Sequence, residues 1–398
     1  MNLILNTNVN QSRKFIIGFL LLVYMVTLII YSNPHNTYIA NYINMALLAV
    51  FAIDRLLDKE FHIYHNVFTD GYALFVLWSA ISCLWSPNIA FSIDITFSMF
   101  QMAINNYLIY NCIKKYDLHS WFIYGIVIAL ALNYLHGFGY IHLDVQTNEN
   151  WRFEGSAGNS NEMGLYIVFG VILSLLSYSR DVIRQWWVLL LLIPLSIYFA
   201  ILTGSRKTTV LLVFFAILYF VPKIGYLFTV KGFFYSILLV LLIGTQVEMK
   251  ELQKVDALRR NINRLSTIVD VATGSKFDGS LEDRKKFLEF GKVMIAKRPL
   301  EGYGIGSFVI LEPSKHYSHN NYIELLFGVG IVGFFIYYFG VFEIMYRAVI
   351  YHSWDILFVV FLILIMELSV VTFNLKPQLL FIIFLSTLLD LDDRKSFN

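Results

Sequence analysis

Apolar segments of membrane-spanning length recur along most of the chain, and they constrain its fold more than any other feature. A helix needs about 20 mainly apolar residues to cross the hydrocarbon core of a bilayer, and it satisfies its own backbone groups there. The pattern predicts an all-α polytopic membrane protein with about twelve transmembrane helices. The charged fraction of 15% agrees, because soluble domains carry about 25%. The segments lie near residues 15–31, 38–53, 71–85, 93–112, 121–142, 162–178, 186–202, 208–222, 230–245, 321–346, 353–372 and 376–391.

The short loops between these segments alternate between loops rich in Lys and Arg and loops with few of them. Basic loops mark the cytoplasmic side of a membrane protein, and long loops are exempt from this rule. Both chain ends are therefore expected in the cytoplasm, with nine spans in residues 1–245, an extracytoplasmic loop at 246–320, and three more spans and a cytoplasmic C-terminus in 321–398. The basic side carries Arg13, Lys14, Arg55, Lys59, Lys114, Lys115, Arg180, Arg184, Lys223, Arg347, Arg394 and Lys395.

The long extracytoplasmic loop has its own pattern. Apolar residues recur at helical spacing before residue 270 and again over 281–295, which predicts two amphipathic helices on the outer membrane surface. Pro299 then ends the second helix. The glycines of "EGYGIGSF" predict a tight backbone near a ligand.

Several cations lie on the outer side, against the charge rule. Arg152, Arg206 and Lys376 either cap helix ends and reach to lipid headgroups, or belong to a site. The two arginines share this side with His319, which favours a site. A guanidinium binds phosphate oxygens through two hydrogen bonds, and an imidazole moves protons near neutral pH.

Other residues leave alternatives open. His316 is a neighbour of His319, and His142 is its rival for proton transfer; any of the three histidines alone fits a polar anchor at the interface. The basic cluster of the outer loop fits either attraction to anionic lipid or a grip on a phosphorylated lipid. The outer loop contains no DxD pair and no HExxH motif, so neither a metal nor a cofactor is expected. The basic cluster consists of Arg259, Arg260, Arg264, Arg284, Lys285, Lys286, Lys297 and Arg298.

Acidic residues within the expected spans leave a transporter or flippase function open as an alternative, because an acid in hydrocarbon must pair with another group or face a cavity. A scaffolding role in a membrane assembly is a third class. These acids are Asp94, Glu324, Glu343 and Glu367.

Five motifs resemble those of the O-antigen ligase and Wzy-type polymerase superfamily and occur in the same order. They are "LWSPNIAFS", "RFEGSAGNSNEMGLY", "LTGSRKTTVLL", "DRKKFLEFGKVMIAKRPLEGYGIGSF" and "HYSHNNYIELLFGVGIVGFF". The resemblance covers most of the chain after about residue 80 and is strongest from Arg284 to Phe335.

The resemblance implies a GT-C-like, metal-independent, inverting glycosyltransferase in a bacterial inner membrane, with its active site on the periplasmic face. His319 matches the histidine proposed to activate the acceptor hydroxyl. Arg152, Arg206 and Arg284 match arginines that hold the donor pyrophosphate. Asn161, Tyr317 and Asn320 would support the site, whereas Arg259, Arg260 and Arg264 have no assigned counterpart.

The resemblance also implies the partners. Donor and acceptor would be oligosaccharides linked to undecaprenyl pyrophosphate, in contact with membrane lipid and a chain-length regulator, without nucleic acid. "SHNNYIELL" favours an O-antigen or capsule polymerase. The alternative is an O-antigen ligase, which transfers the finished chain to a lipid A-core sugar.

Overall fold

The computed structural model describes residues 2–32, 37–58, 63–143, 152–205, 207–209, 211–212, 215 and 279–396. Every regular element in these ranges is helical. The chain divides into two compact units, one formed by Met1–Phe61 and Tyr116–Thr273, the other by His62–Lys115 and Gly274–Asn398. Among the described residues, seven helical segments are long and apolar enough to cross a membrane: Asn10–Ile30, Tyr38–Leu57, Val67–Trp85, His119–Gly137, Ser160–Ser179, Trp186–Thr203 and Asn321–Ile350.

The expected apolar segments and the observed helices agree in position. The segment 230–245 lies outside the described residues, and so does nearly all of 208–222. The segment 353–372 contains a helix shorter than a full span, so the expected number of twelve stays a prediction. The first amphipathic helix of the outer loop also lies outside the described residues, whereas the second is observed as α12 (Gly279–Ile295).

The first unit is built around α6 (Ser160–Ser179), most of whose side chains are buried. It packs against α5 (His119–Gly137) and α7 (Trp186–Thr203), and α5 packs in turn against α1 (Asn2–Ile30). α2 (Thr37–Leu57) also contacts α1. The short helix η2 (Gly155–Ala157) lies between α6, α5 and α1.

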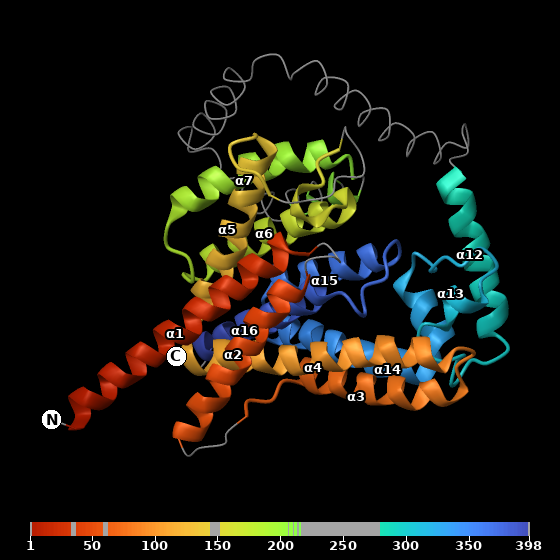
Figure 1. The fold of residues 1–398 in the computed structure, drawn as a ribbon, viewed down its shortest axis with the longest axis horizontal. Helices are drawn as coiled ribbons and strands as arrows, with labels where there is room; N and C mark the ends of the chain where they lie inside the picture. Colours follow the sequence, from red (N-terminus) through yellow and green to blue (C-terminus); the bar gives the residue numbers. More distant parts are fainter. Residues whose placement is uncertain are drawn as a thin grey trace, which may run out of the picture. The chain divides into compact units, whose positions relative to one another are not determined.

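The second unit is built around α14 (Asn321–Ile350). α14 contacts α3 (Val67–Ser82), α15 (Trp354–Glu367), α16 (Lys376–Ser396), α12 and α13 (Ser307–Leu311). In Figure 1, α3 runs alongside α14, and α12 and α13 lie at one end of both. The unit also contains η1 (Cys83–Trp85) and nearly all of α4 (Ile89–Tyr116).

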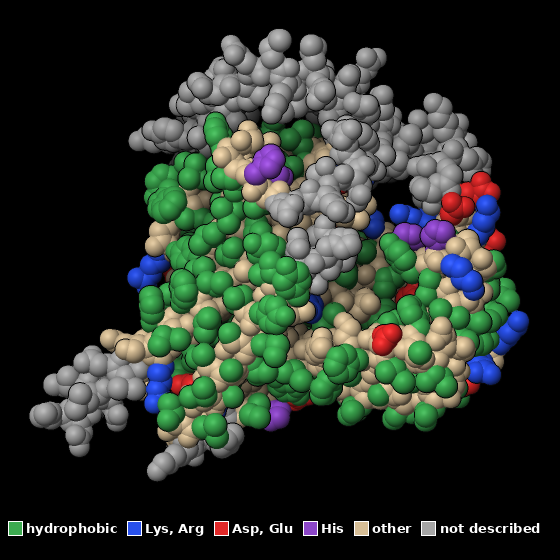
Figure 2. Space-filling model, viewed as in Figure 1, with side chains coloured by type: hydrophobic (Ala, Val, Ile, Leu, Met, Phe, Trp, Pro, Cys, Tyr) green, Lys and Arg blue, Asp and Glu red, His purple; other side chains and the backbone are tan. Residues whose placement is uncertain are grey.

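α14 is broken at Gly330, where φ is 66° and ψ is −172°. The ring of Tyr322 in the first arm stacks on that of Tyr338 in the second, with 5.4 Å between centroids. The second arm therefore folds back beside the first, and the two form a V. Every exposed large apolar side chain of α14 follows the break, and the surface over α3 and α14 is largely hydrophobic (Figure 2). At about 1.5 Å per residue, the second arm spans roughly 30 Å, the thickness of a hydrocarbon core.

The break exposes backbone groups that a helix would otherwise pair, and the segment 299–304 satisfies them. The carbonyls of Phe327 and Gly328 accept from the amides of Tyr303 and Gly304, at 2.9 and 2.7 Å. The amide of Ile331 donates to the carbonyl of Pro299 at 2.8 Å, and the Trp78 indole donates to the carbonyl of Val329 at 2.9 Å. Broken helices persist at membrane depth only where such groups are paired.

The glycines of "EGYGIGSF" form the tight backbone that the sequence predicts, and their approach to a ligand stays a prediction. Gly302 and Gly304 have positive φ, and they let this backbone approach other parts of the protein. A Cβ on Gly302 would lie 2.6 Å from the carbonyl oxygen of Gly328, and one on Gly304 would lie 2.7 Å from the Ser86 Cβ. Glycine at these two positions permits the close packing of the segment 299–304 against the break in α14 and against Ser86.

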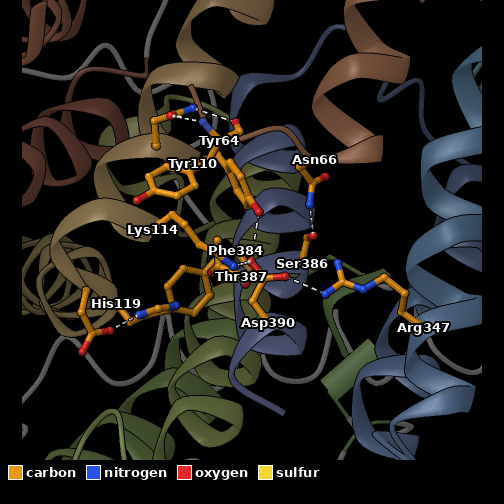
Figure 3. A network of polar contacts seen from close by, with 12 residues as sticks. Tyr64, Asn66, Tyr110, Lys114, His119, Arg347, Phe384, Ser386, Thr387 and Asp390 are labelled. Carbon is orange, nitrogen blue, oxygen red and sulfur yellow. Dashed lines mark hydrogen bonds and ion pairs between the residues drawn. The ribbon is translucent and has the colours of Figure 1, made fainter. Parts of the chain in front are cut away.

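At the other end of the unit, Asp390 of α16 joins three helices. It accepts from the Lys114 ammonium at 2.5 Å and the Tyr110 hydroxyl at 3.0 Å on α4, and from the Arg347 guanidinium at 2.6 Å on α14 (Figure 3). Both cations lie in the last turn of their helices, at positions that the charge pattern assigns to one side of the membrane. They meet at one end of the unit.

Replacing Asp390 by alanine should destabilise this unit by as much as about 3 kcal/mol, because two half-buried cations lose their shared partner. Thermal unfolding of the purified protein in detergent would show a lower midpoint. The exposed acid Glu289, replaced by glutamine, is the matched control and should leave the midpoint unchanged. An unaltered midpoint in Asp390→Ala would mean that water replaces the carboxylate.

Candidate functional site

The segment before α14 is held by its two asparagines. Asn320 caps the helix, since its side-chain oxygen accepts from the amide of Ile323 at 3.0 Å. Its side-chain amide donates to the carbonyl of Leu368 at 3.2 Å. Asn320 thus fixes where the helix begins.

Asn321 ties the same point to the interior of the unit. Its side chain is fully buried, donates to the Tyr338 hydroxyl at 3.0 Å and accepts from the amides of Thr372 and Phe373 at 2.9 and 3.1 Å. Tyr338 donates in turn to the Glu367 carboxyl at 2.6 Å. The acid of α15 therefore has a structural partner, and the network anchors the segment that carries His319.

His319 adopts a left-handed backbone conformation, with φ at 55°. Histidine tolerates this region better than most residues, but it still costs free energy and persists only where the surroundings impose it. Here the neighbouring Ser318 is clamped: its amide donates to the Glu324 carboxylate at 2.9 Å, and its hydroxyl donates to the Asn320 carbonyl at 2.8 Å. These contacts hold the turn that presents the imidazole.

Two aromatic rings restrict the His319 side chain. The Tyr317 ring lies 4.1 Å from the imidazole, centroid to centroid. The Phe287 ring lies 6.2 Å away and nearly parallel, and Phe287 is itself buried in the cluster between α12, α13 and the first arm of α14. The imidazole is thus packed against a fixed surface.

A pocket of about 490 Å³ brings His319 and Arg284 together within the second unit. Arg284 and Phe287 lie three residues apart on α12, on one face of the helix. Figure 2 shows basic, acidic and histidine side chains gathered around this end of α12. The lining residues are Asp283, Arg284, Lys286, Phe287, Glu312, Pro313, Ser314, His316 and His319.

The charge of Arg284 acts on Tyr317. Burial raises the pKa of the Tyr317 phenol, and the Glu324 carboxylate raises it further, while the Arg284 guanidinium lowers it in part. The net pKa is above the ordinary value, so the phenol stays protonated and can donate a hydrogen bond beside His319.

Glu312 places a negative charge in the lining of the same pocket. Burial raises the pKa of its carboxyl, but hydrogen bonds from the Ser314 hydroxyl and from the His316 and Ser314 amides outweigh burial and lower the net value. The contacts to Oε2 are 2.6 Å from the Ser314 hydroxyl and 3.2 Å from the His316 amide. The group is a carboxylate at neutral pH.

In the first unit, Arg152 and Asn161 lie together. The Arg152 Nε donates to the Thr203 carbonyl at 2.8 Å, and a terminal nitrogen donates to the Asn161 side-chain oxygen at 3.4 Å. Thr203 ends α7, three residues before Arg206. Arg206 itself lies outside the described residues, as do Arg259, Arg260 and Arg264. His142 lies beside His136 in this unit and does not line the pocket of His319.

Sequence reasoning did not identify Phe287, Glu312 and Ser314 as parts of the site. Phe287 follows Arg284 at helical spacing, which places it on the same face. The Glu-Pro-Ser run before His316 is a turn signal that could have pointed to Glu312. In the described part of the chain, no three His, Cys, Asp or Glu residues group as metal ligands.

Residues 191–338 match the model of the Wzy_C family, described as O-antigen ligase. The match includes Arg206, Arg284, Tyr317, His319 and Asn320, and it ends within α14. The curated proteins contain no match to the chain. The chain is therefore a multi-pass membrane protein that carries the Wzy_C domain of the O-antigen ligase family, which Wzy polymerases share and which serves polysaccharide transfer.

Proposed function

We propose that this protein is a polysaccharide polymerase, which transfers a glycan chain from undecaprenyl pyrophosphate to the terminal sugar of a lipid-linked repeat unit. The observation that carries the proposal is the pocket that joins His319 and Arg284 inside the region matched by the Wzy_C family. An imidazole beside a guanidinium offers a base for a hydroxyl and a cation for a pyrophosphate.

In the proposed reaction, the acceptor hydroxyl oxygen attacks the anomeric carbon of the donor sugar. The bond from that carbon to the phosphate oxygen breaks, and undecaprenyl pyrophosphate leaves with its electron pair. The hydroxyl proton passes to His319. Arg152, Arg206 and Arg284 bind the pyrophosphate and stabilise its developing charge without a metal ion. Because the hydroxyl attacks in a single displacement, on the face opposite the leaving group, the anomeric configuration inverts.

The cellular setting follows from the charge pattern. With both chain ends in the cytoplasm, α12 and the pocket face the periplasmic side of a bacterial inner membrane. The arrangement is GT-C-like, with about twelve spans. Asn161 and Tyr317 support the arginines and the histidine, and a chain-length regulator is the expected protein partner.

The direct test uses the purified protein and one defined lipid-linked repeat unit, with products sized on a gel. A ladder of products that grows by whole repeats, without added metal or cofactor, is expected. If the purified, folded protein does not lengthen the repeat in any buffer, the polymerase proposal is contradicted.

The family description itself names O-antigen ligase, and this makes the ligase the second candidate. Loss of the gene separates the two. Single repeats on the final acceptor indicate a missing polymerase, whereas full-length polymer left on undecaprenyl indicates a missing ligase.

Replacing Arg284 by lysine should reduce transfer by at least about tenfold, because the ammonium cannot form the two parallel hydrogen bonds of a guanidinium with phosphate. Initial rates with the lipid-linked repeat measure the effect. The matched control is Lys292→Ala, which removes an exposed cation from the same helix and should have no effect. Full activity of Arg284→Lys would show that this position only attracts headgroups.

A further inference from the structure

A second histidine, His316, lines the pocket and faces the same phenyl ring as His319. The imidazole of His316 lies 6.1 Å from the Phe287 ring and is tilted from it by 23°. The imidazole of His319 lies 6.2 Å from the same ring and is tilted by 24°. Two imidazoles are thus packed nearly parallel to one buried phenyl ring at the wall of one pocket.

The hydrogen bonds assign the proton on the His316 ring. The Glu312 carboxylate can only accept, so the Ser314 hydroxyl donates its single hydrogen to it, at 2.6 Å. The Ser314 oxygen can then only accept from the Nδ1 of His316, which lies 3.1 Å away. The neutral imidazole therefore carries its proton on Nδ1 and its lone pair on Nε2.

Glu312 also holds the backbone at this point. The amide of His316 donates to Oε2 of Glu312 at 3.2 Å, the same oxygen that Ser314 contacts. One buried carboxylate thus fixes the position of His316 through the main chain and its tautomer through Ser314.

We propose that Nε2 of His316 accepts a hydrogen bond from a second hydroxyl of the acceptor sugar, whose attacking hydroxyl is the one that His319 activates. This inference rests on the proposed function of the pocket. A nitrogen lone pair repels phosphate oxygens and suits a hydroxyl donor, whereas Arg284 and Lys286 on α12 suit the anion. The two histidines then read two hydroxyls of one sugar ring and determine which acceptor is used.

The experiment pairs acceptor analogues with protein variants. Each hydroxyl of the acceptor's terminal sugar, except the attacking one, is replaced in turn by hydrogen. With the wild-type protein, one such deoxy analogue should lower kcat/KM by about tenfold, as expected for one lost hydrogen bond. His316→Phe keeps the packing against Phe287, should lose a similar factor with the full acceptor, and should not distinguish it from that analogue.

A second variant guards against a folding defect. Ser314→Ala keeps both imidazoles but removes the hydroxyl that holds the proton of His316 on Nδ1. This variant should therefore distinguish the full acceptor from the deoxy analogue less well than the wild-type protein does. His65→Phe changes an exposed histidine outside the pocket and should behave as wild type. The inference is overturned if His316→Phe keeps the wild-type kcat/KM, or if its loss adds to that of every analogue.

The outcomes separate this inference from the proposed function. A wild-type protein that lengthens the repeat, and that loses this activity in His319→Asn, supports the proposed function whatever His316 does. Inactivity of the wild-type protein towards the full acceptor contradicts the proposed function and the inference with it.

Discussion

Replacing His319 by asparagine should stop polymer formation while the protein still folds. Asparagine tolerates the left-handed conformation that residue 319 adopts, so the turn should persist, whereas alanine would add backbone strain to the loss of the base. General base catalysis contributes about 10²–10⁴-fold, and the rate of repeat addition should fall by that factor. Rates with the lipid-linked repeat measure the loss of activity, and gel filtration of the variant shows whether it still folds.

His142 provides the control for this experiment. It is the rival histidine expected near the outer surface, but it lies beside His136 in the first unit and does not line the pocket. His142→Asn should retain wild-type rates. Normal-length polymer from His319→Asn would remove the imidazole of residue 319 from the mechanism. Loss of polymer in His142→Asn would contradict the expectation that the mechanism does not need His142.

Replacing Gly330 by alanine should prevent the second unit from folding. The dihedral angles at this residue are accessible essentially to glycine alone, and strain of this kind costs about 1–3 kcal/mol. An added Cβ would also lie 2.1 Å from the carbonyl oxygen of Leu300, which would push away the segment that pairs the broken helix ends. Fluorescence-detected gel filtration should show aggregated protein.

Gly71→Ala is the matched control for this prediction. Gly71 lies inside α3 of the same unit, and its added Cβ would come no closer than 3.7 Å to any atom. Alanine is also the better helix former, so this variant should be at least as stable as wild type. A monodisperse Gly330→Ala protein would show that α14 can form without the break.

Local periodicity predicted the helices well because hydropathy acts over a single segment. α4 is an instance: its polar residues Asn105 and Asn106 interrupt the apolar pattern, yet the helix is continuous and both are buried. The break in α14 had no comparable signal. "LLFGVGIVGFF" is apolar throughout, and no neighbouring residue distinguishes Gly330 from Gly328 or Gly333. The break is seen only with the hydrogen bonds that the segment 299–304 makes on both sides of it.

The sequence by itself determined the class of protein, the helix positions and the family motifs, because each depends on residues close together in the chain. Only the tertiary structure decided that the segment 299–304 pairs the backbone groups exposed by the break in α14, and that Phe287, Glu312 and Ser314 share a pocket with His319. Those facts depend on which backbone groups lack partners and which side chains meet across α12, α13 and α14. Hydrogen bonds and ring packing between distant segments settle such questions, and no local pattern records them.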